Sequence, residues 1–182
     1  MSGFRLQRTQ CALLVVDVQE KLAAAMPKEA LERMLKRTGA LVEGARALGL
    51  PIVFTEQYPK GLGPTVAVLR EKLSGLSAVE KLRFSAVDDR VRAQLGRRQQ
   101  VLVAGMETHI CVYQTVRELA EDGMLPVLCA DAVLSRFEVD MRVGLQLAAD
   151  AGAMVSTVET ALFDLLGEAG TQEFKRISAA IR

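Results

Sequence analysis

The sequence has no tryptophan, one histidine and five prolines, and aromatic residues make up only 4% of its 182 residues. A chain so poor in aromatics and rich in Ala, Leu and Val is typical of helices packed on a buried sheet, and not of a β-sandwich. No apolar run approaches the roughly 20 residues that a membrane-spanning helix needs. The polar start, MSGFRLQRTQ, lacks the apolar core of a signal peptide. We therefore predict a cytoplasmic protein that does not interact with membranes.

The sequence also lacks an excess of charge of either sign, because 23 Lys and Arg residues face 22 Asp and Glu residues. A nearly neutral chain gives no basic surface for a polyanion, so we expect no nucleic-acid partner. Its three cysteines, Cys11, Cys111 and Cys129, are an odd number in a chain too large to need disulfides. They indicate free thiols in a reducing compartment.

Short apolar runs recur along the whole chain and read as strands, at 11–17, 51–57, 77–85, 99–105, 125–131 and 152–158. Between the first two runs, apolar residues at three- and four-residue steps from Leu31 to Leu48 predict an amphipathic helix that ends at Gly49. The segment YPKGLGP (58–64) reads as a loop because it holds two prolines and two glycines. The alternation predicts one α/β domain over residues 1–182, a three-layer α/β/α fold with a parallel sheet of about six strands.

Reactive side chains at the carboxyl ends of parallel strands are the first candidates for a site, because ligands bind in the crevice there. These candidates are Asp17, Glu56, Lys81, Cys111 and Asp131. Spacing alone does not decide whether Asp17 or Asp131 is the proton acceptor for the cysteine. A helix-capping or loop-fixing role, however, explains Asp131 without chemistry. Glu56 reads as the rim of a pocket at best. Phosphate-binding motifs are missing, which argues against dinucleotides and nucleoside triphosphates.

His109 and Cys111 lie two residues apart and invite the hypothesis of a catalytic dyad. If a helix begins near Thr108, however, their side chains project about 200° apart, so His109 is a poor base for Cys111. A lone histidine and cysteines without close spacing also disfavour a metal site. His109 is better explained by packing, an interface or a pocket wall. Cys111 lies in the first turn, where the helix dipole favours a nucleophilic thiolate.

Three motifs in order resemble those of the isochorismatase-like cysteine hydrolases. They are LLVVDVQEKL with Asp17, EKLRFSA with Lys81, and VAGMETHICVYQTVREL with Cys111. The likeness runs from about residue 10 to residue 160. It includes TEQYPKGLGPT, which is most similar to the isochorismatase domain-containing proteins of undefined substrate.

The resemblance implies a six-stranded parallel sheet and a triad in which Cys111 is the nucleophile. Asp17 would take the thiol proton, and Lys81 would stabilise the thiolate and position the acid. The family also implies a cis peptide at Met106–Glu107, which would direct the Glu107 N–H and the Cys111 N–H to one oxyanion hole. A homo-oligomer is expected on the same ground.

Two departures from the family narrow the expected reaction. Nicotinamidases carry an Asp-x-His-x-x-His metal site in the segment after the second strand, where this chain reads TEQYPKGLGP without histidine. Isochorismatases proper typically have glycine at the position of Cys111. We therefore expect a hydrolase without metal or cofactor that acts on a small amide, carbamoyl or related acyl substrate. Candidate pocket residues are Gln19, Tyr58, Arg83, Phe84, His109 and Tyr113.

Two alternatives remain open at this stage. One is a binding or redox-sensing module in which a low-pKa Cys111 is modified reversibly without turnover. The other is an intact but vestigial triad in a protein that acts by assembling into oligomers.

Overall fold

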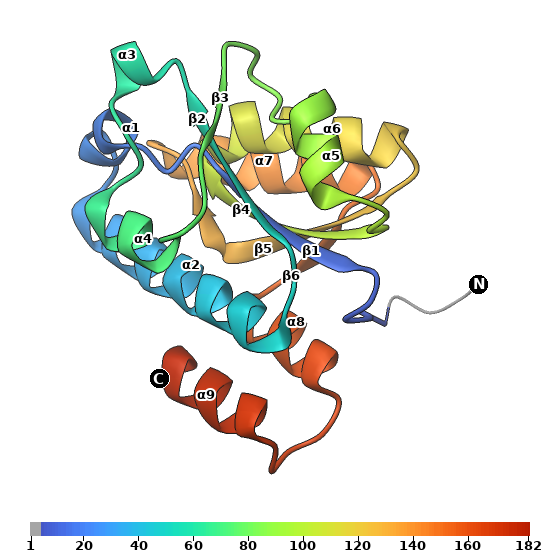
Figure 1. The fold of residues 1–182 in the computed structure, drawn as a ribbon. Coiled ribbons are helices and arrows are strands. Elements are labelled where there is room, and N and C mark those ends of the chain that lie inside the picture. Colours follow the sequence, from blue (N-terminus) through green and yellow to red (C-terminus); the bar gives the residue numbers. More distant parts are fainter. Residues whose placement is uncertain (1–4) are drawn as a thin grey trace.

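Six strands form one sheet in the order β3-β2-β1-β4-β5-β6 in the computed structural model, which describes residues 5–182 (Figure 1). Every pair of neighbouring strands is parallel. The strands are β1 (Cys11–Val16), β2 (Ile52–Gln57), β3 (Val79–Lys81), β4 (Gln100–Met106), β5 (Leu125–Leu134) and β6 (Met154–Ser156). The predicted three-layer α/β fold with about six parallel strands is confirmed.

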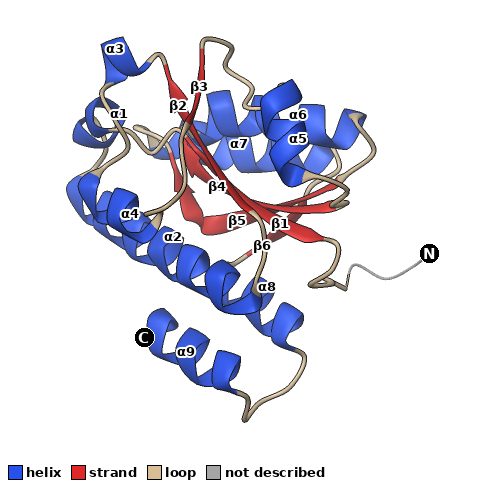
Figure 2. Cartoon of the chain, viewed as in Figure 1, coloured by secondary structure: helices blue, strands red, loops and turns tan. Residues whose placement is uncertain are grey.

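Helices cover both faces of the sheet (Figure 2). One face carries α2 (Lys28–Leu48), α4 (Ala67–Lys72), α8 (Val158–Leu166) and α9 (Gln172–Ile181), and the other carries α5 (Asp89–Leu95), α6 (Tyr113–Glu121) and α7 (Glu138–Asp150). Two short helices, α1 (Glu20–Ala24) and α3 (Pro59–Leu62), lie in the segments after β1 and β2. Among residues 5–182, no helix is long and apolar enough to cross a membrane.

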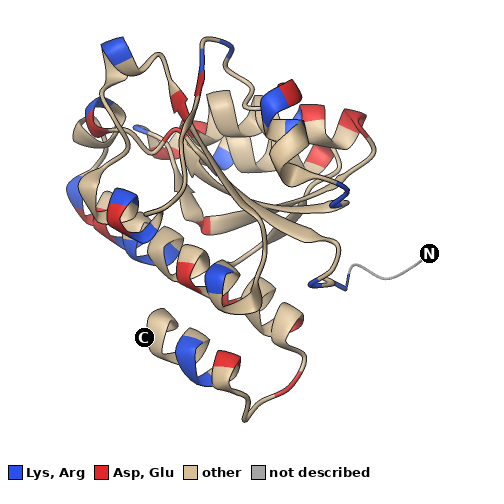
Figure 3. Ribbon diagram, viewed as in Figure 1, with Lys and Arg blue, Asp and Glu red and all other residues tan. Residues whose placement is uncertain are grey.

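The central strand β1 is buried on both faces, as its continuous apolar run predicts. Leu13 and Val15 pack into the core under α2, whereas Ala12 and Leu14 pack into the core under α5 and α6. Figure 3 shows the charged residues mainly on the outer helices and loops, with few on the strands. The predicted helix end at Gly49 is also confirmed, because this glycine caps α2 with a left-handed φ of 68°.

Three local predictions differ from the structure. The segment 58–64 is not a loop throughout, because Pro59 begins the single helical turn α3. Proline is tolerated at the first position of a helix, where the backbone N–H has no partner within the helix. The weak strand expected over 77–85 is only β3, because the chain leaves the sheet after Lys81 and continues in the loop that leads to α5. The strand expected to end at Asp131 instead runs on to Leu134.

A bulge in β5 explains its extra length. Val103 of β4 pairs with Leu128, but Gly105, two residues further on, pairs with Val133, five residues further on. The surplus residues on β5 shift the register, so that Leu134, the last residue of β5, pairs with Met106, the last residue of β4. The loop after β5 is thereby brought beside the segment that follows β4.

The chain crosses from one side of β1 to the other at the middle of the sheet. From β1 the sequence continues through β2 and β3 on one side, then returns to place β4 on the other. Gly105 allows the two central strands to meet closely, because a Cβ at this residue would lie 1.9 Å from the Val16 carbonyl oxygen. Ligands of open parallel sheets bind at such a switch point. Asp17 follows β1 there, and Glu107 follows β4.

Candidate active site

A buried ion pair lies at the carboxyl ends of β1 and β3. Lys81 Nζ lies 2.6 Å from Asp17 Oδ2, and the two side chains are 4% and 0% exposed. Asp17 adopts a left-handed φ of 50°, which Asp tolerates better than most residues. The strand order β3-β2-β1 thus brings together two residues that are 64 positions apart in the sequence.

The intervening strand β2 completes the hydrogen bonds of this pair. Thr55 Oγ1 donates to Asp17 Oδ1 at 2.7 Å, and Lys81 Nζ donates to Gln57 Oε1 at 2.9 Å. Lys81 Nζ also lies 3.1 Å from the Arg83 carbonyl oxygen and 2.9 Å from that of Phe84. The ammonium group is therefore fixed from several sides, as a buried charge requires.

Burial raises the pKa of the Asp17 carboxyl above its ordinary value, and the Lys81 charge opposes this rise. A carboxylate in this setting is a stronger base than one in water. It still has the adjacent ammonium to compensate its charge. The pair is thus suited to accept a proton and to return it.

Cys111 lies in the π-helical turn η1 (Thr108–Val112), which leads directly into α6. Its side chain is buried. Burial and then the Asp17 carboxylate raise the pKa of the Cys111 thiol to about 12, while the Lys81 ammonium acts in the opposite direction. Burial thus favours the neutral thiol, in contrast to the thiolate that the helix end was expected to favour. A neutral thiol needs a base before it can attack as a nucleophile.

The segment between β4 and Cys111 is built around Glu107. The Met106–Glu107 peptide bond is cis. The Glu107 carbonyl oxygen accepts hydrogen bonds from the N–H groups of Ile110 at 3.0 Å and Val112 at 3.2 Å. Its buried side chain accepts two further hydrogen bonds from Arg136. Glu107 therefore anchors the turn that carries Cys111.

His109 turns toward the loop that follows β5. Its Nδ1 lies 3.0 Å from Ser135 Oγ, and its Nε2 lies 3.8 Å from Asp140 Oδ2 on α7. This placement agrees with a packing role and gives His109 no part in the Asp17–Lys81 pair.

Asp131 and Glu56 hold the backbone in place. Asp131 Oδ1 accepts a hydrogen bond from the Val158 N–H at the start of α8, and its other oxygen lies 3.6 Å from Arg37 Nε. Glu56 Oε1 accepts hydrogen bonds from the backbone N–H and the hydroxyl of Thr65, both at 2.7 Å. The loop-fixing interpretation of Asp131 therefore matches its contacts.

The six candidate pocket residues do not share one cavity. Tyr58 and Arg83 line a cavity of 640 Å³ together with Lys81, along the edge of β3. Phe84 is exposed, and its carbonyl oxygen holds Lys81. Tyr113 packs against Arg117 on the outer surface of α6.

Gln19 was expected in the pocket but has a structural role. Its Nε2 donates to the carbonyl oxygens of Gln57 at 3.0 Å and Gly63 at 2.7 Å, and its Oε1 accepts the Gln57 N–H at 2.7 Å. These bonds tie the end of β2 to the segment after β1. Because the side chain is buried and its amide is already bonded at both ends, substrate binding does not explain it.

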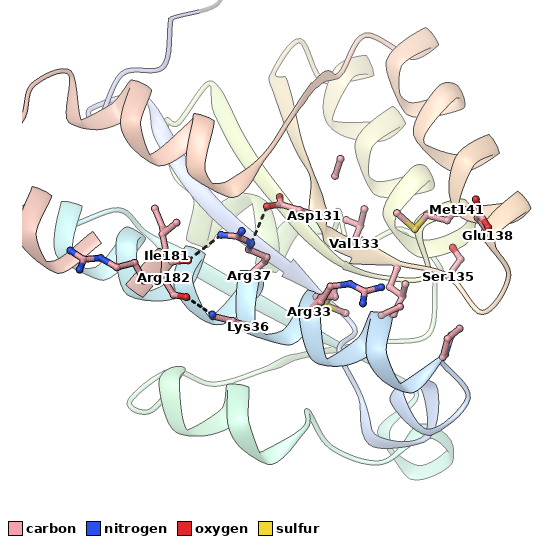
Figure 4. Close-up of a pocket in the computed structure, with 15 residues that line it drawn as sticks. Arg33, Lys36, Arg37, Asp131, Val133, Ser135, Glu138, Met141, Ile181 and Arg182 are labelled. Carbon is pink, nitrogen blue, oxygen red and sulfur yellow. Dashed lines mark hydrogen bonds and ion pairs between the residues drawn. The ribbon is translucent and has the colours of Figure 1, made fainter. Parts of the chain in front are cut away.

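A larger cavity of 740 Å³ lies between α2, β5 and α7 (Figure 4). Along this cavity, Arg37 forms an ion pair with Asp131 and donates a hydrogen bond to the Ile181 carbonyl oxygen. Lys36 donates a hydrogen bond to the Arg182 carbonyl oxygen. Ser135 stands on its wall. The Asp17–Lys81 pair and Cys111 lie outside this cavity, so its size does not mark it as the reaction site.

Four residues of the site escaped the sequence reasoning, namely Thr55, Gln57, Ser135 and Arg136. Thr55 and Gln57 lie with Glu56 in the polar second half of a strand that begins with three apolar residues, and that contrast could have marked them. Ser135 and Arg136 carried no comparable signal. Within residues 5–182, His, Cys, Asp and Glu side chains nowhere gather in a group of three or more that could hold a metal ion.

Comparison with known proteins identifies the family. The sequence model of the isochorismatase domain matches residues 11–160. Isochorismatase domain-containing protein 2 of Bos taurus is 37% identical over 93% of this chain and 82% of its own length. The secreted isochorismatase effector Isc1 of Phytophthora sojae is 33% identical over 98% of this chain and 87% of its own. The chain belongs to the isochorismatase family, and the match defines an isochorismatase-family hydrolase domain.

A solved structure supports the same assignment. A protein of Caenorhabditis elegans described as MAR1 ribonuclease superimposes with a TM-score of 0.91. It is 34% identical in sequence, and the alignment covers 97% of this chain and 92% of that one. The six-stranded parallel sheet is thus the fold of the family.

Proposed function

We propose that this protein, as one domain over residues 1–182, is a metal-independent cysteine hydrolase of small amide, carbamoyl or related acyl substrates. The observation that carries the proposal is the buried Asp17–Lys81 pair, whose two charges affect the pKa of the nearby Cys111 thiol. A neutral thiol beside a desolvated carboxylate is a nucleophile paired with its base.

The proposed reaction has two halves. As Cys111 Sγ attacks the carbonyl carbon, its proton passes to Asp17, and the carbonyl π-bond electrons move to the oxygen. When the tetrahedral intermediate collapses, the carbon–nitrogen bond breaks, and the amine leaves with the proton from Asp17. Water then attacks the thioester, giving a proton to Asp17, and the released Cys111 sulfur takes that proton back. Lys81 compensates the negative charge in both halves.

An oxyanion hole from the Glu107 N–H and the Cys111 N–H completes the proposal. Both groups belong to the segment anchored by the Glu107 carbonyl and side chain. Donors held in place before the reaction are worth about 3 to 4 kcal/mol each toward the transition state. Tyr58 and Arg83, which share a cavity with Lys81, are the residues that we propose to contact the rest of the substrate.

The test is a screen of small amides, carbamoyl compounds and esters against wild type, Cys111→Ala and the matched control Cys129→Ala. Cys129 is a buried thiol in β5, away from the proposed chemistry. We expect turnover in wild type and Cys129→Ala, none in Cys111→Ala, and a thioester adduct on Cys111 by mass spectrometry. Turnover that a chelator abolishes would contradict the metal-free mechanism.

The name of the Caenorhabditis elegans relative adds one arm to the screen. Because that protein is described as a ribonuclease, a labelled RNA should be included. The near-neutral charge of this chain argues against RNA binding. Cleavage of RNA that Cys111→Ala abolishes would replace the amide proposal.

The redox-sensing alternative requires a thiolate at rest, and the raised pKa of Cys111 argues against it. A vestigial triad would show no turnover in the same screen.

We also propose a homo-oligomer in the cytoplasm. On α7 the apolar side chains of Val139, Val143 and Leu147 are exposed at four-residue steps, the pattern of a helix face that another subunit covers. Light scattering should show an oligomer that Val143→Glu dissociates and that Val155→Glu, on β6, does not.

The cytoplasmic location is supported by the three free, buried cysteines, which fit a reducing compartment. The Phytophthora relative, in contrast, is named as secreted. Cell fractionation tests whether this protein is found in the cytoplasm.

A further inference from the structure

The loop after β5 is hydrogen-bonded to the segment 107–111, which carries the proposed nucleophile Cys111. The Arg136 backbone N–H and its side-chain Nε each donate to Glu107 Oε2 at 3.0 Å. One residue earlier, Ser135 Oγ lies 3.0 Å from His109 Nδ1. Two successive residues of this loop therefore hold two residues of the segment leading to Cys111.

Helix α7 packs against the backbone of the same segment. A Cβ at Gly144 would lie 2.8 Å from the Cα and N of His109 and 2.9 Å from the carbonyl carbon of Thr108. The helix thus packs directly against the backbone of η1, with no side chain between them. The turn has little freedom to move away from the loop.

Glu107 also affects the nucleophile through its charge. Its carboxylate is among the groups that raise the pKa of the Cys111 thiol. The Arg136 guanidinium, 3.0 Å from this carboxylate, compensates that charge. The charges of Asp17 and Lys81, which lie at the ends of β1 and β3, also act on Cys111.

We propose that Arg136 and Ser135 are positioning residues that hold the turn of Cys111 in its reactive placement, with Arg136 also shielding the thiol from the Glu107 charge. The inference rests on the proposed function, in which Cys111 is the nucleophile. It assigns to the loop after β5 a part in a reaction whose reacting groups lie on β1, β3 and η1.

The test measures alkylation of Cys111 by iodoacetamide against pH, with the modified peptide identified by mass spectrometry. In Arg136→Ala, the uncompensated Glu107 charge should slow alkylation about tenfold at each pH between about 7 and 9, the effect of raising the pKa of the thiol by one unit. Arg136→Lys, which keeps the charge, should restore most of the rate. Ser135→Ala should slow alkylation only about twofold, because it removes one neutral hydrogen bond to His109 and no charge.

Arg142→Ala is the matched control, because Arg142 is an exposed arginine on α7. It should alkylate at the wild-type rate. On any substrate found, Arg136→Ala should lower kcat with KM little changed, as expected for a displaced nucleophile. Circular dichroism and thermal unfolding establish that each variant is folded. If Arg136→Ala is not folded, Arg136→Gln takes its place, because it removes the charge and keeps a polar side chain.

Wild-type alkylation and an unshifted pH profile in folded Arg136→Ala or Arg136→Gln would overturn the inference. The alkylation measurement needs no substrate, so the two proposals fail separately. If wild type turns over no substrate but the Arg136 variants shift the profile, the positioning role stands and the hydrolase proposal falls. If wild type turns over a substrate but the Arg136 variants alkylate as wild type does, the hydrolase proposal stands and the positioning role falls.

Discussion

Asp17 follows a strand of the sheet and Asp131 lies on another strand of it, and each carboxylate faces a cation, yet their surroundings differ. Asp17 is fully buried and lies 2.6 Å from Lys81. Asp131 is 28% exposed and lies 3.6 Å from Arg37. Asp17 has its partners on neighbouring strands, whereas Asp131 bonds the first N–H of α8.

The difference follows from position in the sheet. Asp17 follows β1, at the point where the chain continues to β2 on one side and later returns to place β4 on the other, which is where ligands of open parallel sheets bind. Asp131 lies within β5, on the bulge, where α2 and α8 cover it. The chemical type of a residue at a strand end is therefore not enough to predict its role, because the strand order decides what it meets.

The largest contrast is expected in activity. Asp17→Asn removes the base while keeping the shape, so turnover should fall about 100- to 10,000-fold, the usual contribution of a positioned base. Asp131→Asn should retain turnover within a few-fold of wild type. Steady-state kinetics on the best substrate of the screen measures both. Equal losses would show that the two carboxylates do not differ in function.

The next contrast is in stability. Lys81→Met leaves the Asp17 charge buried without its partner, which should lower the free energy of unfolding by about 3 to 5 kcal/mol at pH 7. Because burial raises the pKa of Asp17, its ionisation destabilises the folded state as pH rises through that pKa. The deficit of Lys81→Met should therefore shrink as pH falls. Urea unfolding at pH 7 and pH 5 checks the sign, and the double variant Asp17→Asn/Lys81→Met should recover part of the loss.

A pH profile of turnover sharpens the comparison further. Asp17 must be ionised to take the thiol proton, and its pKa lies above the ordinary value of 3.8. Activity should therefore fall on the acid side at a pH above that value, while the protein is still folded by circular dichroism. Asp131→Asn should leave this limb in place. An acid limb that coincides with unfolding would count against Asp17 as the base.

The smallest effect is expected when only the structural carboxylate is changed. Asp131→Ala removes the acceptor of the Val158 N–H, which should cost about 1 to 2 kcal/mol, as for other residues that cap a helix. Thermal unfolding should show the loss, and turnover should be nearly unaffected. A loss of activity without a loss of stability would assign Asp131 a chemical role.

The sequence predicted the sheet well, because buried parallel strands are continuous apolar runs that local reading can find. Asp17, Lys81 and Cys111 were chosen as candidates by their places beside such runs and by family resemblance. Two properties were not predictable in this way. The pKa of Cys111 depends on burial that only the assembled core provides, and Gln19 was assigned to a pocket although its amide spans two segments far away in the sequence.

The contacts of Ser135 and Arg136 were also beyond local reading, because they depend on the bulge in β5. This bulge has a consequence for how the length of the chain can vary. A one-residue deletion between Leu128 and Val133 would exchange the faces of the side chains beyond it and draw Arg136 back from Glu107. Shortening here should therefore impair the site more than trimming the exposed turn around Gly123, although both changes lie outside the Asp17–Lys81 pair.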